Sequence, residues 1–181
     1  MAYNDHYKRA LIVLKRTVDI ESLWNTFIPE VFRERTWTKL LNPMVDVYDC
    51  IIRKFFANAF VEGDHINCWV GGEFIFWRES IQELLEIQPT TLDTPLHYDE
   101  RKEKLEPLVQ VLGGQLKKKA LHMIEFTPEM QALAYIMIFN LYLEKNLTTL
   151  SVPRTVFLHD LFTHKKIDIC GHIYHLFVKC I

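Results

Sequence analysis

The strongest helical pattern of apolar residues in this chain lies between Val45 and Phe60. Within it, apolar positions recur at i, i+3, i+4 and i+7, which places them along one face of a helix. Pro43 stands just ahead of the segment, where proline suits the first turn of a helix. The pattern therefore predicts a helix over 45–60 whose aromatic stripe is buried in the core. The stripe consists of Val45, Tyr48, Ile51, Ile52, Phe55, Phe56 and Ala59.

A second predicted helix, over 130–143, is apolar nearly all round, which is typical of a central helix. Thr127 and Pro128 precede it and fit the N-cap and the first helical position. Ser80 and Glu83 have the spacing of a capping box and predict the start of a shorter helix. Weaker patterns predict the remaining helices. They cover residues 7–15, 20–32, 115–123, 154–162 and 169–178.

Between residues 65 and 77 the apolar spacing changes from the helical period to a period of two, which is typical of strands. Gly71 and Gly72 interrupt this alternation, and two glycines tolerate the positive φ of a tight hairpin turn. The segment therefore predicts a β-hairpin. We expect its side chains Phe74 and Phe76 to pack onto the helices over 45–60 and 130–143.

Together these elements predict a mainly α fold, a single compact helical domain over 1–181 with about seven to eight helices and one β-hairpin. The composition agrees, because 49% hydrophobic and 13% aromatic residues are enough to build a core. Residues 90–104 differ from the rest of the chain. They are polar, contain Pro95 and end in a cluster of charges, so they predict a mobile loop.

Charge and cysteine usage narrow the class of protein. Lys and Arg number 21 against 23 Asp and Glu, so a net charge of −2 provides no general attraction to nucleic acid or anionic lipid. The longest apolar run is too short to span a bilayer, and no membrane partner is expected. The four cysteines lie far apart and the first residues lack the pattern of a secretory signal. We therefore expect reduced thiols in an intracellular protein of the nucleus or cytoplasm.

No set of residues in the sequence has the spacing of a known catalytic or metal site. Cys170, His172, His175 and Cys180 are zinc-ligand types, but their spacing matches no standard zinc module. Carboxylates that could bind a catalytic metal show no triad spacing either. We therefore predict no enzyme, no metal and no cofactor. The acidic candidates are Asp46, Asp49, Glu62, Asp64, Glu73, Asp160 and Asp168.

Three clusters of basic residues are candidates for a nucleic-acid-binding face. Two tryptophans, Trp69 and Trp77, would stack on bases if they are exposed, or would dock a partner protein through an apolar patch. Solvated helix faces and core tryptophans are the plainer explanation of the same residues. The basic candidates are Arg53, Lys54, Lys117, Lys118, Lys119, Lys165 and Lys166.

Several segments, taken in order, resemble the plant transposon protein domain, a plant-specific family found in retroelement-derived reading frames. The similar segments are Arg35–Leu40, Val47–Tyr48, Arg53–Asn58 and Val70–Gly72, and the similarity extends over nearly the whole chain. Two positions depart from the family pattern. Phe56 stands where the family usually has Tyr, and Gly71 where it usually has Arg.

The resemblance implies an origin in a mobile element and a mostly helical fold, and it supplies no catalytic residues. The leading prediction is a non-enzymatic, retroelement-derived interaction module that self-associates or contacts nucleic acid. One alternative is a metal-dependent nucleic-acid-processing enzyme, which requires the acidic candidates to converge. Another is a domesticated host regulator that docks a partner protein through Trp69 and Trp77.

Overall fold

The computed structural model describes residues 17–42, 48–88, 97–98, 101, 103–117, 120–142 and 148–181. This part of the chain contains seven α-helices, α2 to α8, and two three-stranded antiparallel sheets. The predicted mainly α class is confirmed. The described residues form two small sheets, whereas the sequence predicted a single hairpin. None of the described helices has the length and apolar character needed to cross a membrane.

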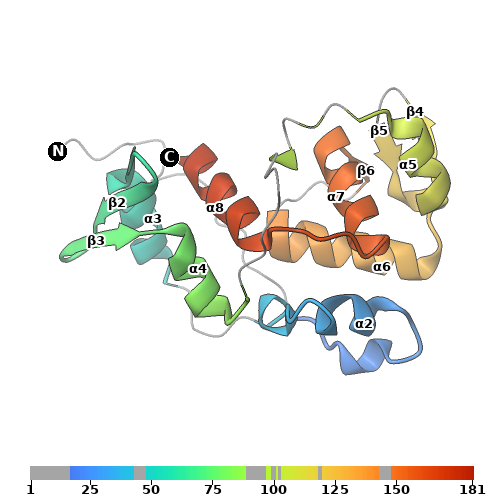
Figure 1. The fold of residues 1–181 in the computed structure, drawn as a ribbon, viewed down its shortest axis with the longest axis horizontal. Helices are drawn as coiled ribbons and strands as arrows, with labels where there is room; N and C mark the ends of the chain where they lie inside the picture. Colours follow the sequence, from blue (N-terminus) through green and yellow to red (C-terminus); the bar gives the residue numbers. More distant parts are fainter. Residues whose placement is uncertain are drawn as a thin grey trace.

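Most of the core belongs to a helical body built from four helices. These are α2 (Ile28–Arg33), α5 (Leu105–Leu112), α6 (Pro128–Met137) and α7 (Val152–Phe162). α7 packs against both α5 and α6, and Figure 1 shows these helices together at one end of the molecule. Three short 3₁₀ turns complete the body. They are η1 (Glu21–Leu23), η2 (Thr38–Leu40) and η4 (Met123–Glu125).

α6 is the central helix that its apolar sequence predicts. Thr127 caps it, since the side-chain oxygen accepts a hydrogen bond from the Met130 amide at 3.3 Å. After Met137 the chain continues as a π-helix, η5 (Ile138–Tyr142). Leu133 and Met137 are fully buried, so the predicted core role of this segment is confirmed.

Residues 115–117 and 120–122 form strands, so the helix predicted over 115–123 is wrong. β4 (Gln115–Lys117) and β5 (Ala120–His122) pair antiparallel, and β5 also pairs with β6 (Thr149–Leu150). Gly113 adopts φ +74° and ends α5, and a Cβ on Gly114 would lie 2.6 Å from a Leu121 side-chain carbon. This close approach of backbone to β5 favours a hairpin over a continued helix.

A second group of elements lies at the other end of the long axis (Figure 1). It consists of α3 (Asp49–Asn58), β1 (Phe60–Glu62), β2 (His65–Trp69) and β3 (Glu73–Phe76), and we call it the sheet lobe. The strands follow the order β1-β2-β3, all antiparallel. The predicted hairpin is confirmed, with Ile66 opposite Phe76, Cys68 opposite Phe74 and φ +73° at Gly71.

The predicted burial of the first apolar helix is wrong. No residue of α3 is buried, and Phe55 and Phe56 stay partly exposed while their rings contact Phe177 at centroid distances of 6.2 and 6.0 Å. Periodicity reveals an apolar face but not the size of the surface that covers it. α3 packs on the single strand β2 and the end of one helix, too little to enclose it. Residues 43–47, including Pro43, lie outside the described residues.

The hairpin also packs elsewhere than expected. Phe76 contacts Tyr174 and Phe177, with centroids 6.4 and 5.5 Å apart, and Phe74 remains 53% exposed. Both ring partners belong to α8 (Ile169–Cys180), which lies between the sheet lobe and the helical body in Figure 1. The sheet lobe therefore packs against α8, whereas the sequence predicted packing against the helix over 130–143.

α4 (Arg78–Leu85) links the sheet to the helical body and packs against α8. It begins two residues before the predicted cap. Ser80 stands at the third helical position, and its hydroxyl accepts a hydrogen bond from the Trp77 amide at 3.2 Å. The helix ends before Glu86, whose φ of +55° is left-handed.

Candidate functional site

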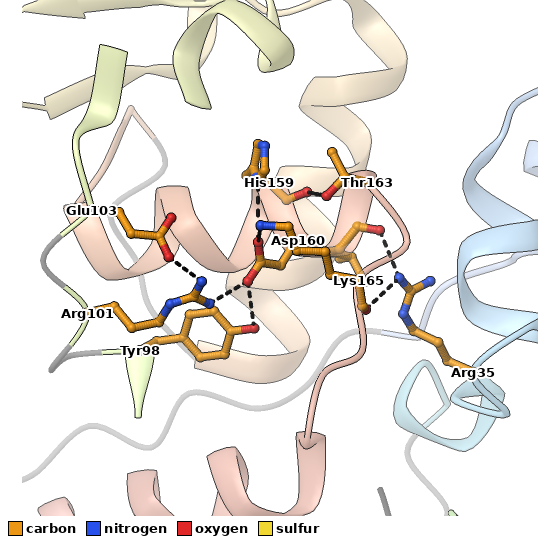
Figure 2. Close-up of polar contacts among 9 residues, drawn as sticks. Arg35, Tyr98, Arg101, Glu103, His159, Asp160, Thr163 and Lys165 are labelled. Carbon is orange, nitrogen blue, oxygen red and sulfur yellow. Dashed lines mark hydrogen bonds and ion pairs between the residues drawn. The ribbon is translucent and has the colours of Figure 1, made fainter. Parts of the chain in front are cut away.

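The most connected polar group is a buried carboxylate on α7 (Figure 2). Asp160 is 3% exposed and accepts hydrogen bonds from the Tyr98 hydroxyl at 3.3 Å and from the Arg101 guanidinium. Its other oxygen lies 3.0 Å from Lys165 Nζ and 3.1 Å from His159 Nδ1. We call Tyr98, Arg101, His159, Asp160 and Lys165 the Asp160 network.

The titration behaviour of this network favours a structural role. Burial raises the pKa of Asp160, but hydrogen bonds from Arg101, Lys165 and His159 outweigh burial and hold that pKa below its usual value. Burial first, and the Asp160 charge second, raise the pKa of Tyr98. At neutral pH the carboxylate stays ionised and the phenol stays protonated, so neither is poised for acid–base catalysis. The network instead holds Tyr98 and Arg101 against α7.

Arg35 extends the same arrangement to α2. Its guanidinium donates hydrogen bonds to the carbonyl oxygens of Val31 at 2.9 Å, Leu161 at 3.2 Å and Lys165 at 3.3 Å. Figure 2 shows this side chain reaching the chain just after α7. Arg35 therefore links the end of α2 to the end of α7. These hydrogen bonds go to backbone carbonyl oxygens, which indicates a structural role.

Asp168 joins α4 to α8 in a comparable way. One carboxylate oxygen accepts a hydrogen bond from the Gly171 amide at 3.0 Å and caps α8, while the other accepts one from Arg78 Nη2 at 2.6 Å. A Cβ on Gly171 would lie 2.2 Å from this carboxylate, so only glycine leaves room for the cap.

We expect Asp168→Ala to lower the free energy of unfolding by about 2 kcal/mol, because the cap and a charged hydrogen bond disappear together. Asp168→Asn is the matched control, since asparagine is also a good N-cap. It should lose less than half as much in urea unfolding. Equal losses in the two variants would show that the cap contributes nothing.

The acidic candidates do not converge. Among the described residues, no three or more His, Cys, Asp or Glu side chains are grouped so that they could hold a metal ion. Arginines bind Asp160 and Asp168, and Arg53 binds Asp49 at 2.8 Å. Asp46 lies outside the described residues, and the other three acids lie at the surface of the sheet lobe.

The zinc-ligand residue types near the C-terminus serve packing. His172 is 5% exposed, with ring centroids 5.0 Å from Phe157 and 5.4 Å from Tyr98. Burial, followed by the charge of Asp168, raises the pKa of the Cys170 thiol to about 11. A protonated thiol is neither a metal ligand nor a nucleophile at neutral pH. None of the four cysteines is joined to another in a disulfide.

The basic candidates come from three separate parts of the fold. Arg53 and Lys54 lie on α3, Lys117 ends β4, and Lys165 and Lys166 follow α7. α3 and β4 stand toward opposite ends of the long axis (Figure 1). Arg53 and Lys165 are already paired with carboxylates at 2.8 and 3.0 Å. The side chain of Lys117 and all of Lys118 and Lys119 lie outside the described residues.

A shallow groove lies between η1 and α6, with a volume of about 370 Å³. Its lining is mostly apolar, and Asp19 is its one carboxylate. The groove gathers no acid and base that could act together. Its lining residues are Thr17, Val18, Asp19, Ser22, Leu23, Ala132, Tyr135, Ile136, Phe139 and Asn140.

The two predicted tryptophans lie on one exposed face of the sheet lobe. Trp69 is 63% exposed and Trp77 38% exposed. The register places Phe60, Asn67 and Ile75 side by side across the three strands, and strand alternation puts Trp69 and Trp77 on that same side. We call this side the outer face. Its residues are Phe60, Glu62, His65, Asn67, Trp69, Glu73, Ile75 and Trp77.

The opposite side of the sheet is covered at its central strand only, since Val61 and Phe74 on that side are 42% and 53% exposed. Ile66 is fully buried and Cys68 is 3% exposed, and the Cys68 thiol donates a hydrogen bond to the Phe55 carbonyl of α3 at 3.3 Å. The outer face has no such cover from the described residues. Phe60 and Ile75 are both among the exposed large hydrophobic residues there.

The carboxylates of the outer face have no Lys or Arg beside them in the strands. From Phe60 to Trp77 the sequence contains three carboxylates, Glu62, Asp64 and Glu73, and no Lys or Arg. Asn67 donates a hydrogen bond to Glu62 at 2.5 Å, while its own side-chain oxygen accepts none from the described residues. His65 stacks on Trp77 at a centroid distance of 4.4 Å. The face thus combines exposed rings with negative charge.

Comparisons with protein-family models, curated proteins and solved structures give no match to this chain. The resemblance to the plant transposon protein domain therefore stays a prediction that rests on the quoted residues alone.

Proposed function

We propose that this chain is a non-enzymatic interaction module that binds a partner protein through the outer face. The observation that carries the proposal is the group of exposed apolar side chains on one side of a sheet whose central strand packs against α3 on its other side. Single exposed hydrophobic residues are ordinary, but a group on one flat surface is typical of protein contact sites. Aromatic residues are also the usual anchors of such contacts.

The available surface is large enough to matter energetically. Covering the exposed part of Trp69 would remove roughly 100–150 Å² from water, worth about 3 kcal/mol at about 25 cal/mol per Å². Association costs at least about 4 kcal/mol, so one ring is not sufficient. Trp69, Phe60, Ile75 and Trp77 together offer several anchors for one partner.

Two other candidate functions have less support. A nucleic-acid face would need cations beside the tryptophans, whereas residues 60–77 contain three carboxylates, which repel phosphate, and no Lys or Arg. A metal-dependent nuclease would need gathered carboxylates, and the described residues contain no group of three or more His, Cys, Asp or Glu that could hold a metal ion. An origin in a plant retroelement is compatible with an interaction module and is proposed on the sequence resemblance only.

The proposal is tested by placing a photo-crosslinking amino acid at Trp69 in the full chain, in cells that express it. We expect a discrete adduct that disappears when Ile75→Lys is added, because the lysine disrupts the apolar surface. Ile124, 81% exposed on η4, is the matched control position and should give no such adduct. The same adducts from both positions, or none from Trp69, would contradict the proposal.

A further inference from the structure

β3 presents an open edge. In the described part of the chain it pairs with β2 on one side only, so its outward amide and carbonyl groups are available for another strand. Its side chains Phe74 and Ile75 are exposed on opposite sides of the sheet. Edges are normally protected by lysine, proline or a bulge. β3, with the sequence Glu-Phe-Ile-Phe, contains neither lysine nor proline.

β1, the other edge, is less suited to accept a strand. It has three residues and follows α3 directly, with the Ala59 amide still bonded to the Phe55 carbonyl at 2.8 Å. α3 also packs against the neighbouring strand β2. β3 is one residue longer and is followed by α4, which turns away toward the helical body (Figure 1).

The charge of the sheet indicates the chemistry of an incoming strand. Glu73 begins β3 opposite Trp69. Glu62 on β1 and Asp64 in the β1–β2 turn lie at the other end of the sheet, 64% and 85% exposed. The nearest cation after the sheet, Arg78, is held by Asp168 at 2.6 Å. A negative surface of this kind attracts basic segments and repels acidic ones.

Resting on the proposed function, we propose that the partner contributes an extended basic and apolar segment that joins β3 as a fourth strand. Side chains of adjacent strands on one face lie opposite each other. A cation of the segment therefore pairs with Glu73, an aliphatic residue covers Ile75, and a second cation lies over the ring of Trp77. Residues between these positions face Phe74 and Phe76 and are apolar. The recognised pattern is basic–apolar–apolar–apolar–basic.

The probe is a labelled peptide, Arg-Lys-Val-Ile-Val-Arg-Lys, whose pattern of basic and apolar residues is the same in both strand directions. Two matched peptides replace either its cations by Glu or its central Ile by Pro, which removes a backbone donor. With the full chain at low salt, we expect fluorescence anisotropy to show about 30-fold tighter binding of the basic peptide than of the Glu peptide, from several charge pairs. The Pro peptide should bind about 10-fold more weakly, because strand pairing is interrupted.

Variants of the protein locate the contact. Glu73→Lys should weaken binding of the basic peptide about 10-fold, and Glu129→Lys, an exposed position on α6, should leave it unchanged. Bound peptide should slow amide hydrogen exchange in β3 and not in β1. Equal binding of basic and acidic peptides, or protection of β1 alone, would overturn the inference.

The outcomes separate this inference from the proposed function. If Trp69 still gives its adduct but the basic peptide has no preference, the docking face stands and the peptide class is wrong. Residues 8–16 of this chain, Lys-Arg-Ala-Leu-Ile-Val-Leu-Lys-Arg, have a similar pattern. A dimer in sedimentation that disappears when these four cations become Glu would assign the edge to a second copy and overturn the partner assignment.

Discussion

Replacing Asp160 with alanine is expected to lower the free energy of unfolding by about 3–5 kcal/mol. Asp160 is 3% exposed, and it accepts hydrogen bonds from Arg101, Tyr98 and Lys165. Its removal leaves the guanidinium of Arg101, 21% exposed, with Glu103 as its remaining carboxylate partner, and the Tyr98 hydroxyl without its acceptor. Removing one partner of a buried charged pair costs far more than the intact pair contributes.

Urea unfolding of the two proteins measures this loss, and Asp49→Ala is the matched control. Asp49 also binds an arginine, at 2.8 Å, but its side chain is 61% exposed. Exposed pairs contribute about 0–1 kcal/mol, so this variant should remain close to wild type. Similar losses in the two variants would show that the Asp160 network does not stabilise the fold.

The same carboxylate predicts the response to acid. Because the folded pKa of Asp160 lies below its unfolded value, its contribution is complete above the unfolded pKa. The contribution disappears as the pH falls through the folded pKa. Urea titrations from pH 7 to pH 3 should therefore show a steeper loss of stability in wild type than in Asp160→Asn below about pH 4. Parallel curves would contradict a lowered pKa.

The second large effect is expected at Phe157, where alanine should cost about 3–5 kcal/mol. Phe157 is fully buried on α7, and its ring lies 4.9 Å from Tyr98, 5.0 Å from His172 and 5.8 Å from Tyr142, centroid to centroid. Alanine would leave a cavity among these rings. The loss appears in thermal or urea unfolding.

Phe74→Ala is the matched control for this substitution. It removes the same atoms from a side chain that is 53% exposed on the edge strand. The expected change in unfolding free energy is less than about 1 kcal/mol. A loss at Phe74 as large as that at Phe157 would mean that the sheet lobe, rather than the helical body, limits stability.

Local signals in the sequence predicted α6, α7, α8 and the hairpin. Thr127 and Pro128 mark the start of α6 because capping and proline placement act within one turn. The period-two spacing between residues 65 and 77 predicted the hairpin, since side chains alternate between the two faces of a strand. Structural features that depend on residues close together in the sequence could therefore be predicted.

Structural features that depend on residues far apart in the sequence could not be predicted. Asp160 was among the acidic candidates, but its partners Tyr98 and Arg101 lie 62 and 59 positions away. The apolar stripe of α3 is real, yet the surface that covers it comes from β2 and α8. The strand pair at 115–122 depends on its contact with β6, which lies beyond residue 148.

The candidate site was predicted in part. Trp69 and Trp77 were identified from the sequence as partner-binding candidates, but alternation does not tell which face of a sheet meets solvent. The absence of Lys and Arg between Phe60 and Trp77 was visible in the sequence. This absence gains meaning only once the structure shows that the rings and the acids share the outer face.

The most direct test of the docking claim compares stability and binding in one double variant, Trp69→Ser with Ile75→Ser. We expect an unfolding free energy within about 1 kcal/mol of wild type, because the described residues leave both side chains exposed. We also expect at least about 30-fold weaker binding of the basic peptide. A loss of stability comparable to that of Phe157→Ala, with unchanged peptide binding, would show that the outer face serves folding and contradict the account.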